Sequence, residues 1–145
     1  MRVIDIFKQE IISTGIALLL FSCELEEIPD EITFEKTFGG PANDGGQSVQ
    51  QTRDGGYIIT GYTESKGNGG RDVYLIKTNA NGEIVNTNGD IVFEKTFGET
   101  ANDEGYSVQQ TQDGGYIITG YTESTGEGGR DVYLIKTNAN GEVEQ

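Results

Sequence analysis

The chain has no histidine and no tryptophan, and it has one cysteine and two prolines in 145 residues. Because histidine is the commonest general base and a frequent metal ligand, its absence excludes serine-triad and histidine-zinc chemistry. One cysteine excludes an intrachain disulfide and a cysteine-cluster metal site. Basic residues are scarce, with 10 Lys and Arg against 24 Asp and Glu and a formal charge of −14. Since phosphate contacts need clustered cations, this balance argues against nucleic acid as a partner.

The one long apolar run, residues 11–21, lies near the N-terminus. It is short for a bilayer-spanning helix, which needs about 20 residues. It fits the hydrophobic region of a secretory signal, with Arg2 and Lys8 as a weakly basic start. The segment Leu20-Phe21-Ser22-Cys23 resembles the lipobox of bacterial lipoproteins, which implies that Cys23 is lipidated and becomes the mature N-terminus. The alternative is a buried core helix that ends in an incidental cysteine.

Residues 24–27 are Glu-Leu-Glu-Glu and follow the cysteine directly. They resemble the acidic export tags of surface lipoproteins in some Gram-negative lineages, and they also suit a solvated tether. The resemblance implies a location in the cell envelope of a Gram-negative bacterium, at the outer membrane or the cell surface. The membrane is then a partner through the lipid anchor at Cys23.

A repeat fills the rest of the chain. Residues 34–83 and 93–142 align without gaps at an offset of 59, and 43 of 50 positions are the same. The copies differ only at positions 40, 41, 45, 47, 53, 66 and 68 and their counterparts. Self-similarity of this period is typical of repeat arrays. The predicted organisation is a signal peptide (1–22), an acidic tether (23–30), a first β-repeat (31–84), a short hairpin insertion (85–91) and a second β-repeat (92–145).

The local pattern within a repeat predicts strands and turns only. Residues 33–38, 48–52, 57–63 and 72–78 alternate or concentrate aromatic and β-branched residues, as strands do. Gly61 within the strongest strand indicates a β-bulge or the close approach of another backbone. Residues 53–56 and Asn81-Gly82 are turn signals. Each repeat is therefore expected to form four antiparallel strands, which predicts an all-β fold after an N-terminal signal helix.

The segments 54–63, 69–77 and 79–82 resemble the repeats of bacterial β-propellers of the seven-bladed type. The resemblance covers about residues 31–145, and it implies two propeller-like blades that act as a scaffold. It carries over no catalytic residue. Closed propellers use about four to eight blades, so two blades form an incomplete propeller.

An incomplete propeller can arise in three ways. The gene is a truncated member of a longer array, or two to four chains close a ring, or the two repeats pack as a small open β-structure. The expected function is a non-catalytic binding or scaffolding module, with a glycan or a protein as its ligand. The alternatives are a fragment of a carbohydrate-active propeller and a gene remnant without independent function.

Two sets of side chains are candidate ligand contacts. Asn79, Asn81, Glu83 and Asp90 place oxygens at spacings that a calcium loop uses, but Asn-Gly is also a strong hairpin signal, and this favours a turn. Tyr62, Tyr74, Tyr121 and Tyr133 could stack on sugars, although tyrosines in such strands more often pack between blades. No cofactor other than calcium is indicated.

Overall fold

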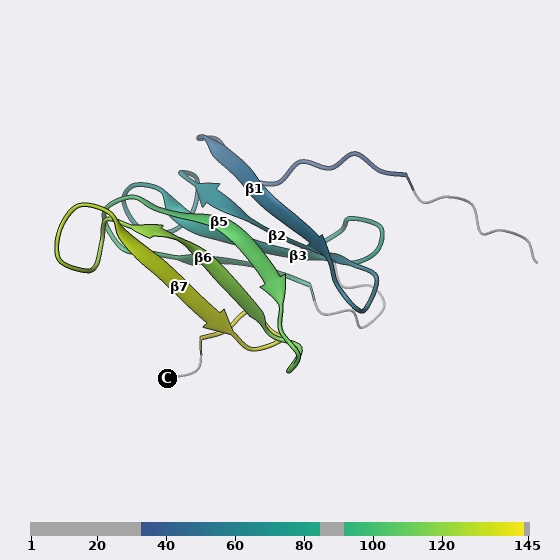
Figure 1. The fold of residues 1–145 in the computed structure, drawn as a ribbon. Helices are drawn as coiled ribbons and strands as arrows, with labels where there is room; N and C mark the ends of the chain where they lie inside the picture. Colours follow the sequence, from purple (N-terminus) through teal and green to yellow (C-terminus); the bar gives the residue numbers. More distant parts are fainter. Residues whose placement is uncertain (1–32, 85–91, 144–145) are drawn as a thin grey trace, which may run out of the picture. The chain divides into compact units, whose positions relative to one another are not determined.

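Residues 33–84 and 92–143 are described by the computed structural model of the chain, and all of them belong to one unit that spans residues 32–145 (Figure 1). Their regular structure consists of β-strands alone. The strands are β1 (Asp44–Gln51), β2 (Tyr57–Thr63), β3 (Asp72–Thr78), β4 (Phe93–Phe97), β5 (Asp103–Gln110), β6 (Tyr116–Thr122) and β7 (Asp131–Thr137). Within this part of the chain, no helix is long and apolar enough to cross a membrane.

The strands form two antiparallel sheets. Sheet 1 has the order β1-β2-β3-β4 and sheet 2 has the order β5-β6-β7. The all-β fold predicted from the sequence is confirmed. The predicted signal helix and the insertion at 85–91 lie outside the described residues.

Two of the predicted strands, 57–63 and 72–78, have the predicted bounds. β2 and β3 pair in continuous register from Tyr57 opposite Thr78 to Thr63 opposite Asp72. Their side chains alternate between the two faces of the sheet. β1 begins at Asp44, four residues before the predicted start, because Asp44 pairs with the end of β2. The predicted bounds of this strand were therefore wrong at its N-terminal side.

Gly61 marks both features that its position in the strand indicated. The register between β1 and β2 shifts between Gly46 and Ser48, opposite Gly61, which is a β-bulge. A β-carbon at Gly61 would collide with the carbonyl oxygen of Gly45. The second repeat has the same bulge opposite Gly120.

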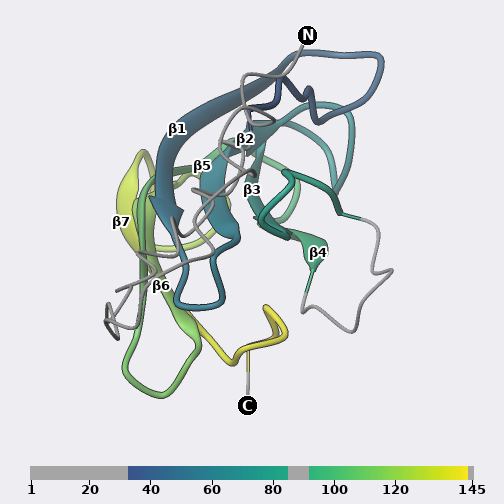
Figure 2. The same cartoon turned by 90° about the vertical axis from the view of Figure 1, so that its right-hand side faces the viewer.

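The predicted strand at residues 33–38 is absent, although its copy in the second repeat is β4. The pentapeptides at 34–38 and 93–97 have the same sequence. β4 pairs with β3 and so completes sheet 1 of the first repeat, as Figure 2 shows. Residues 34–38 have no such neighbour among the described residues. The expectation that each repeat supplies its own four strands was therefore wrong, because the fourth strand comes from the next repeat.

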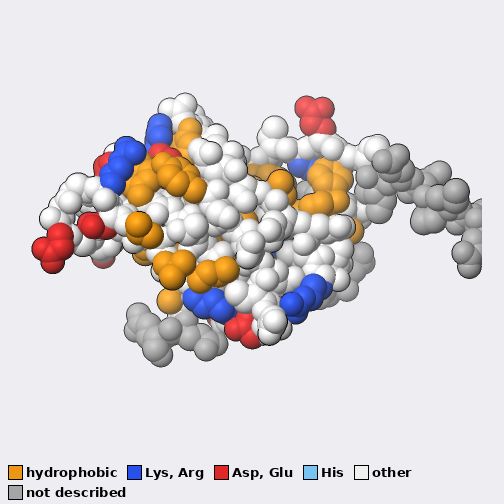
Figure 3. Space-filling view, in the orientation of Figure 1, with side chains coloured by type: hydrophobic (Ala, Val, Ile, Leu, Met, Phe, Trp, Pro, Cys, Tyr) orange, Lys and Arg blue, Asp and Glu red, His pale blue; other side chains and the backbone are white. Residues whose placement is uncertain are grey.

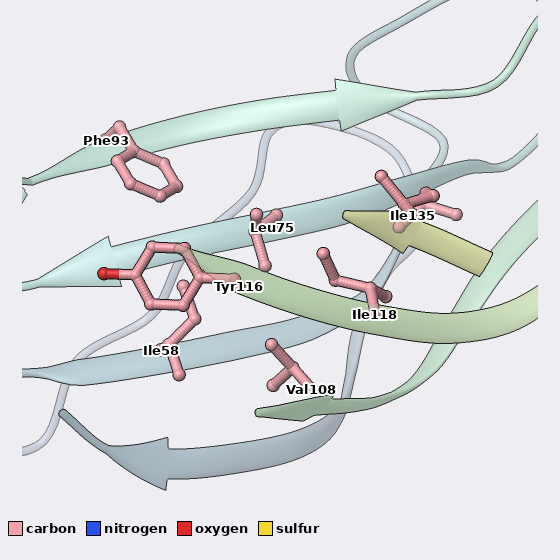
Figure 4. Close-up of a cluster of buried hydrophobic side chains, with 8 residues drawn as sticks. Ile58, Leu75, Phe93, Val108, Tyr116, Ile118 and Ile135 are labelled. Carbon is pink, nitrogen blue, oxygen red and sulfur yellow. The ribbon is translucent and has the colours of Figure 1, made fainter. Parts of the chain in front are cut away.

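The hydrophobic core lies between the two sheets (Figure 4). Ile58, Val73 and Leu75 of sheet 1 face Val108 and Ile118 of sheet 2, and all are at most 1% exposed. The cluster is completed by Phe93, Tyr116 and Ile135. Burying side chains of this kind is worth roughly 1.5–3 kcal/mol each, so the facing sheets stabilise one another.

Candidate functional site

The junction between the two repeats is built around β4. The ring of Phe93 packs edge-on against Tyr116 of sheet 2, with 5.8 Å between ring centroids and 67° between planes. Lys95 Nζ lies 3.9 Å from the carboxylate of Glu142. β4 thus pairs its backbone with sheet 1, while the side chains of Phe93 and Lys95 contact the rest of the second repeat. This arrangement locks the two repeats together.

The segment Phe34–Phe38 lies on the first repeat in the same way. Phe34 packs against Tyr57 with 5.6 Å between ring centroids and 68° between planes. Lys36 Nζ lies 4.0 Å from Glu83. The segment therefore has the side-chain placement of β4 without a strand beside it in the described part of the chain.

A charged network crosses the junction at Arg71. Its guanidinium bonds Glu64 at 2.9 Å and Glu104 of the second repeat at 2.5 Å, and it lies over the Tyr62 ring at 4.2 Å. The hydrogen bonds to Glu104 and Glu64 raise the pKa of Arg71. The backbone N–H of Asp103 donates to the Arg71 carbonyl at 2.6 Å. Side chain and backbone together hold this end of the junction.

A second network joins Lys66, Tyr74 and Glu94. Lys66 Nζ lies 2.6 Å from Glu94 and 3.1 Å from the Tyr74 hydroxyl, which itself donates to Glu94. Burial, followed by the hydrogen bond to Glu94, raises the pKa of Tyr74 to about 12. Burial alone would raise the pKa of Glu94, but the hydrogen bonds from Lys66 and Tyr74 outweigh it and lower that pKa. The network is therefore an ion pair at neutral pH, with a protonated tyrosine.

Two buried carboxylates also meet at this junction. Asp72 is 1% exposed and Asp103 is 0% exposed. Burial raises the pKa of Asp72, and the charge of Asp103 raises it further. Oδ1 of Asp103 has no hydrogen-bond partner among the described residues. Across residues 33–84 and 92–143, no cluster of three or more His, Cys, Asp or Glu side chains could hold a metal ion.

The outer face of sheet 2 is apolar and open. Val132 and Leu134 on β7 are 83% and 66% exposed, whereas Val73 and Leu75, their counterparts on β3, are fully buried. Figure 3 shows hydrophobic side chains gathered over β7. Among the described residues, β7 pairs with β6 only, so its other edge has free backbone groups.

The outer face of sheet 1 is also apolar. Val49 is 61% exposed, whereas its counterpart Val108 is 1% exposed in the core. A hollow of about 280 Å³ opens on this face. It is lined by Phe34, Phe38, Val49, Tyr57, Ile59 and Thr78. The exposed face of sheet 1 therefore corresponds to the face of sheet 2 that lies in the core. The exposed face of sheet 2 corresponds in turn to the face of sheet 1 that lies in the core.

The four candidate tyrosines do not form one patch. Tyr62 and Tyr121 each lie under an arginine, at 4.2 Å from Arg71 and 4.1 Å from Arg130. Tyr74 is 3% exposed and bound to Lys66 and Glu94 as described above. Its counterpart Tyr133 packs against the core.

Side chains at these tyrosine positions also point to different sides of the sheets. In sheet 1, Gly61 pairs with Tyr74 and Tyr62 pairs with Val73, so the two tyrosines occupy opposite faces. The same alternation separates Tyr121 from Tyr133 in sheet 2. The set predicted from the sequence therefore does not line one groove.

The calcium candidates are engaged in a turn. Oδ1 of Asn79 accepts hydrogen bonds from the backbone N–H groups of Asn81 and Glu83, both at 2.9 Å. Gly82 has φ +71°, which suits glycine. Asp90 lies outside the described residues, as does Cys23.

The sequence interpretation missed the charged residues of the junction. Glu104 replaces Gly45 of the first repeat, and Lys66 is replaced by Thr125 in the second. In the part of the chain that the structure describes, both ion pairs that cross the junction therefore use a residue that only one copy possesses. The few positions at which the copies differ were the signal that could have identified them.

Comparisons with protein-family models, with curated proteins and with solved structures found no match to this chain.

Proposed function

We propose that this chain is a non-catalytic lipoprotein of the bacterial cell envelope and that its two repeats are propeller-type blades, which serve as a binding or scaffolding module. The observation that carries the proposal is the position of β4, because the second repeat supplies this strand as the outer strand of the first repeat's sheet. A strand supplied in this way links successive units of an array, because each unit is incomplete without the next.

The side chains at the junction also favour a scaffold. Arg71 and Lys66 are engaged with carboxylates of the second repeat, and Tyr74 donates its hydroxyl to Glu94. These groups bind one another across the repeats and stabilise their contact. A nucleophile aligned with a base, which enzymatic chemistry of the acyl-transfer kind needs, is not part of this network.

The envelope location rests on the N-terminal sequence. Leu20-Phe21-Ser22-Cys23 has the lipobox pattern, and Cys23 is the chain's single cysteine. A lipid at this position attaches the repeats to a membrane through the short acidic segment that follows. Stable anchoring takes two membrane signals, so the proposal requires more than one acyl chain on Cys23.

The lipid anchor is tested with Cys23→Ala in the full chain. We expect the variant to lose incorporation of labelled fatty acid and to leave the detergent phase of a cloud-point extraction. Ser22→Ala is the matched control, because alanine keeps a small residue before the cysteine and should leave lipidation intact. A Cys23→Ala protein that still incorporates fatty acid would refute the anchor.

The non-catalytic role is tested with immobilised glycans. A binding module retains a glycan and releases it unchanged, whereas a carbohydrate-active enzyme releases shortened products. We expect retention without new reducing ends over hours of incubation. Turnover of any glycan would contradict the proposal and support the alternative of a carbohydrate-active fragment.

A further inference from the structure

We propose that a second copy of this chain completes sheet 2: its Phe34–Phe38 segment adds to the free edge of β7, and its sheet-1 face packs on Val132 and Leu134. The inference names the partner of the scaffolding module proposed above, and its biological meaning rests on that proposal. The contact is head to tail, because the second repeat of one copy meets the first repeat of the next.

The incoming strand is already placed for this role. Phe34 and Lys36 make the contacts with Tyr57 and Glu83 that Phe93 and Lys95 make with Tyr116 and Glu142. In the second repeat, a segment in this position pairs with β3. The sequence of β7 is the same as that of β3. Extended segments bind exposed sheet edges through backbone hydrogen bonds, so β7 is a matching acceptor.

The repeat fixes the expected register. β3 and β4 pair antiparallel with Val73 opposite Phe97, Leu75 opposite Lys95 and Lys77 opposite Phe93. The same register between copies places Val132 opposite Phe38 of the second copy. It also places Leu134 opposite Lys36 and Lys136 opposite Phe34.

The apolar faces match in the same way. Inside one chain, Val73 and Leu75 are covered by the face of sheet 2 that carries Val108 and Ile118. Between copies, the exposed Val132 and Leu134 would be covered by the face of sheet 1 that carries Val49 and Ile59. Each of these four residues has a counterpart of the same type, 59 positions away, in the internal contact. The contact between copies would therefore repeat a contact that already forms within one chain.

A glycine on the open face keeps room for the second copy. Gly105 lies in the internal junction, where a β-carbon would collide with Thr60 Oγ1 and lie 3.1 Å from Val73. Its counterpart Gly46 lies on the open face, where the nearest atom to a β-carbon is Ile59 Cγ2 at 3.7 Å. A side chain at Gly46 is thus harmless to the isolated chain but would press on the docked copy.

The contact between copies lacks the two ion pairs of the internal junction. Arg71 meets Glu104, but its counterpart Arg130 would meet Gly45 of the second copy. Lys66 meets Glu94, whereas Thr125 would face Glu35. The contact between copies therefore consists of strand pairing and apolar packing, and it is weaker than the junction within a chain.

Contacts of this heterologous kind close into a ring when the rotation per copy allows it. Propellers close with about four to eight sheets, which corresponds to two to four copies of this chain. A ring removes the free edge of β7 in every copy and covers every open face.

Disulfide cross-linking tests the register in the full chain, purified in detergent. Lys36→Cys and Leu134→Cys are introduced into separate molecules, which are then mixed under mild oxidation. Residues directly opposite each other on antiparallel strands have β-carbons about 4.5–5.5 Å apart, near the range of a disulfide. We expect a cross-linked pair from the mixture.

Two controls calibrate the reaction. Leu75→Cys with Lys95→Cys in one chain occupies the same register inside the molecule and should close rapidly. Lys36→Cys mixed with Ile135→Cys should not react, because Ile135 is 5% exposed and belongs to the opposite face. A mixture that cross-links no faster than this second control overturns the proposal. Cross-linking of the parental chain through Cys23 would count against the lipid anchor and leave this proposal unaffected.

Two further variants separate docking from folding. Gly46→Ala should leave unfolding of the isolated chain unchanged and weaken self-association about 10-fold or more. Thr125→Lys should strengthen it about two- to fivefold by restoring an ion pair to Glu35 of the second copy, and adding Glu35→Lys should cancel the gain. An assembly that is insensitive to Gly46→Ala and Thr125→Lys forms through another surface and overturns the proposal, as does a chain that stays monomeric.

Discussion

Leu75 and Leu134 occupy the same position in the two repeats, and their environments predict very different effects of truncation. Leu75 is fully buried between the sheets, whereas Leu134 is 66% exposed. Leu75→Ala removes buried methyl groups and leaves a cavity, so we expect a loss of about 2–5 kcal/mol in the free energy of unfolding. Leu134→Ala in the dissociated chain should change it by less than about 0.5 kcal/mol.

The assay is urea unfolding of the full chain, followed by the fluorescence of its seven tyrosines in the absence of tryptophan. At high dilution, Leu75→Ala should lower the free energy of unfolding by about 2–5 kcal/mol, and Leu134→Ala should change it by less than about 0.5 kcal/mol. At concentrations where copies associate, the cost of Leu134→Ala should rise toward that of Leu75→Ala, because the second copy then buries Leu134. Val143→Ala is the control, since Val143 is 52% exposed and lies outside both sheets.

If Leu75→Ala and Leu134→Ala lowered the free energy of unfolding equally at high dilution, the buried position of Leu75 and the exposed position of Leu134 would be refuted. A Leu134→Ala cost that is independent of concentration would refute burial of Leu134 by a second copy.

Two further substitutions test the sheet and a buried cation. Gly61→Ala should destabilise the chain by at least about 2 kcal/mol, because the new methyl group collides with the backbone of β1. Gly128 has open space around it, so Gly128→Ala should cost only about 1 kcal/mol, which comes from its positive φ. Thermal melts measure both costs. Asp54→Ala should cost about 1–3 kcal/mol because it leaves the 1%-exposed Lys77 without its carboxylate partner, and Asp113→Ala, the exposed counterpart, should have little effect.

The effect of Asp54 should also depend on pH. Burial would raise the pKa of Asp54, but hydrogen bonds from Thr52, Lys77 and Gly56 outweigh it and lower that pKa below 3.8. A lowered pKa in the folded state means that this carboxylate stabilises the fold above pH 3.8 and that the contribution is lost as the pH falls through the lowered value. Asp54→Ala and the parental chain should therefore converge in acid.

The strands that the sequence predicted best are those in which β-branched and aromatic residues are most concentrated. β2 and β3 combine β-branched and aromatic residues over seven positions each, and their bounds were predicted correctly. The bulge opposite Gly61 was predictable because glycine weakens a strand interior and is found there mainly at bulges and close backbone contacts.

The strand at residues 33–38 was predicted wrongly for a physical reason. Its pentapeptide forms a strand at 93–97 and none at 34–38, so its sequence cannot decide its state. A strand needs a neighbour for its backbone hydrogen bonds, and only the copy beside β3 has one in the described residues. The ion pair between Arg71 and Glu104 could not be predicted for a related reason, since the two residues are distant in sequence and meet only in the folded chain.

Hydrogen exchange at β7 tests the central claim most directly, because Asp72–Thr78 and Asp131–Thr137 share one sequence and therefore nearly the same intrinsic exchange rates. Peptides that end at Ile84 and Val143 differ in mass and report the two strands separately. At high dilution, the β7 peptide should exchange faster than the β3 peptide, because one edge of β7 has no neighbouring strand within residues 33–84 and 92–143. At high concentration, its protection should approach that of β3. A β7 peptide that is as protected as β3 at high dilution, or one that stays unprotected in the associated state, would contradict completion of sheet 2 by a second copy.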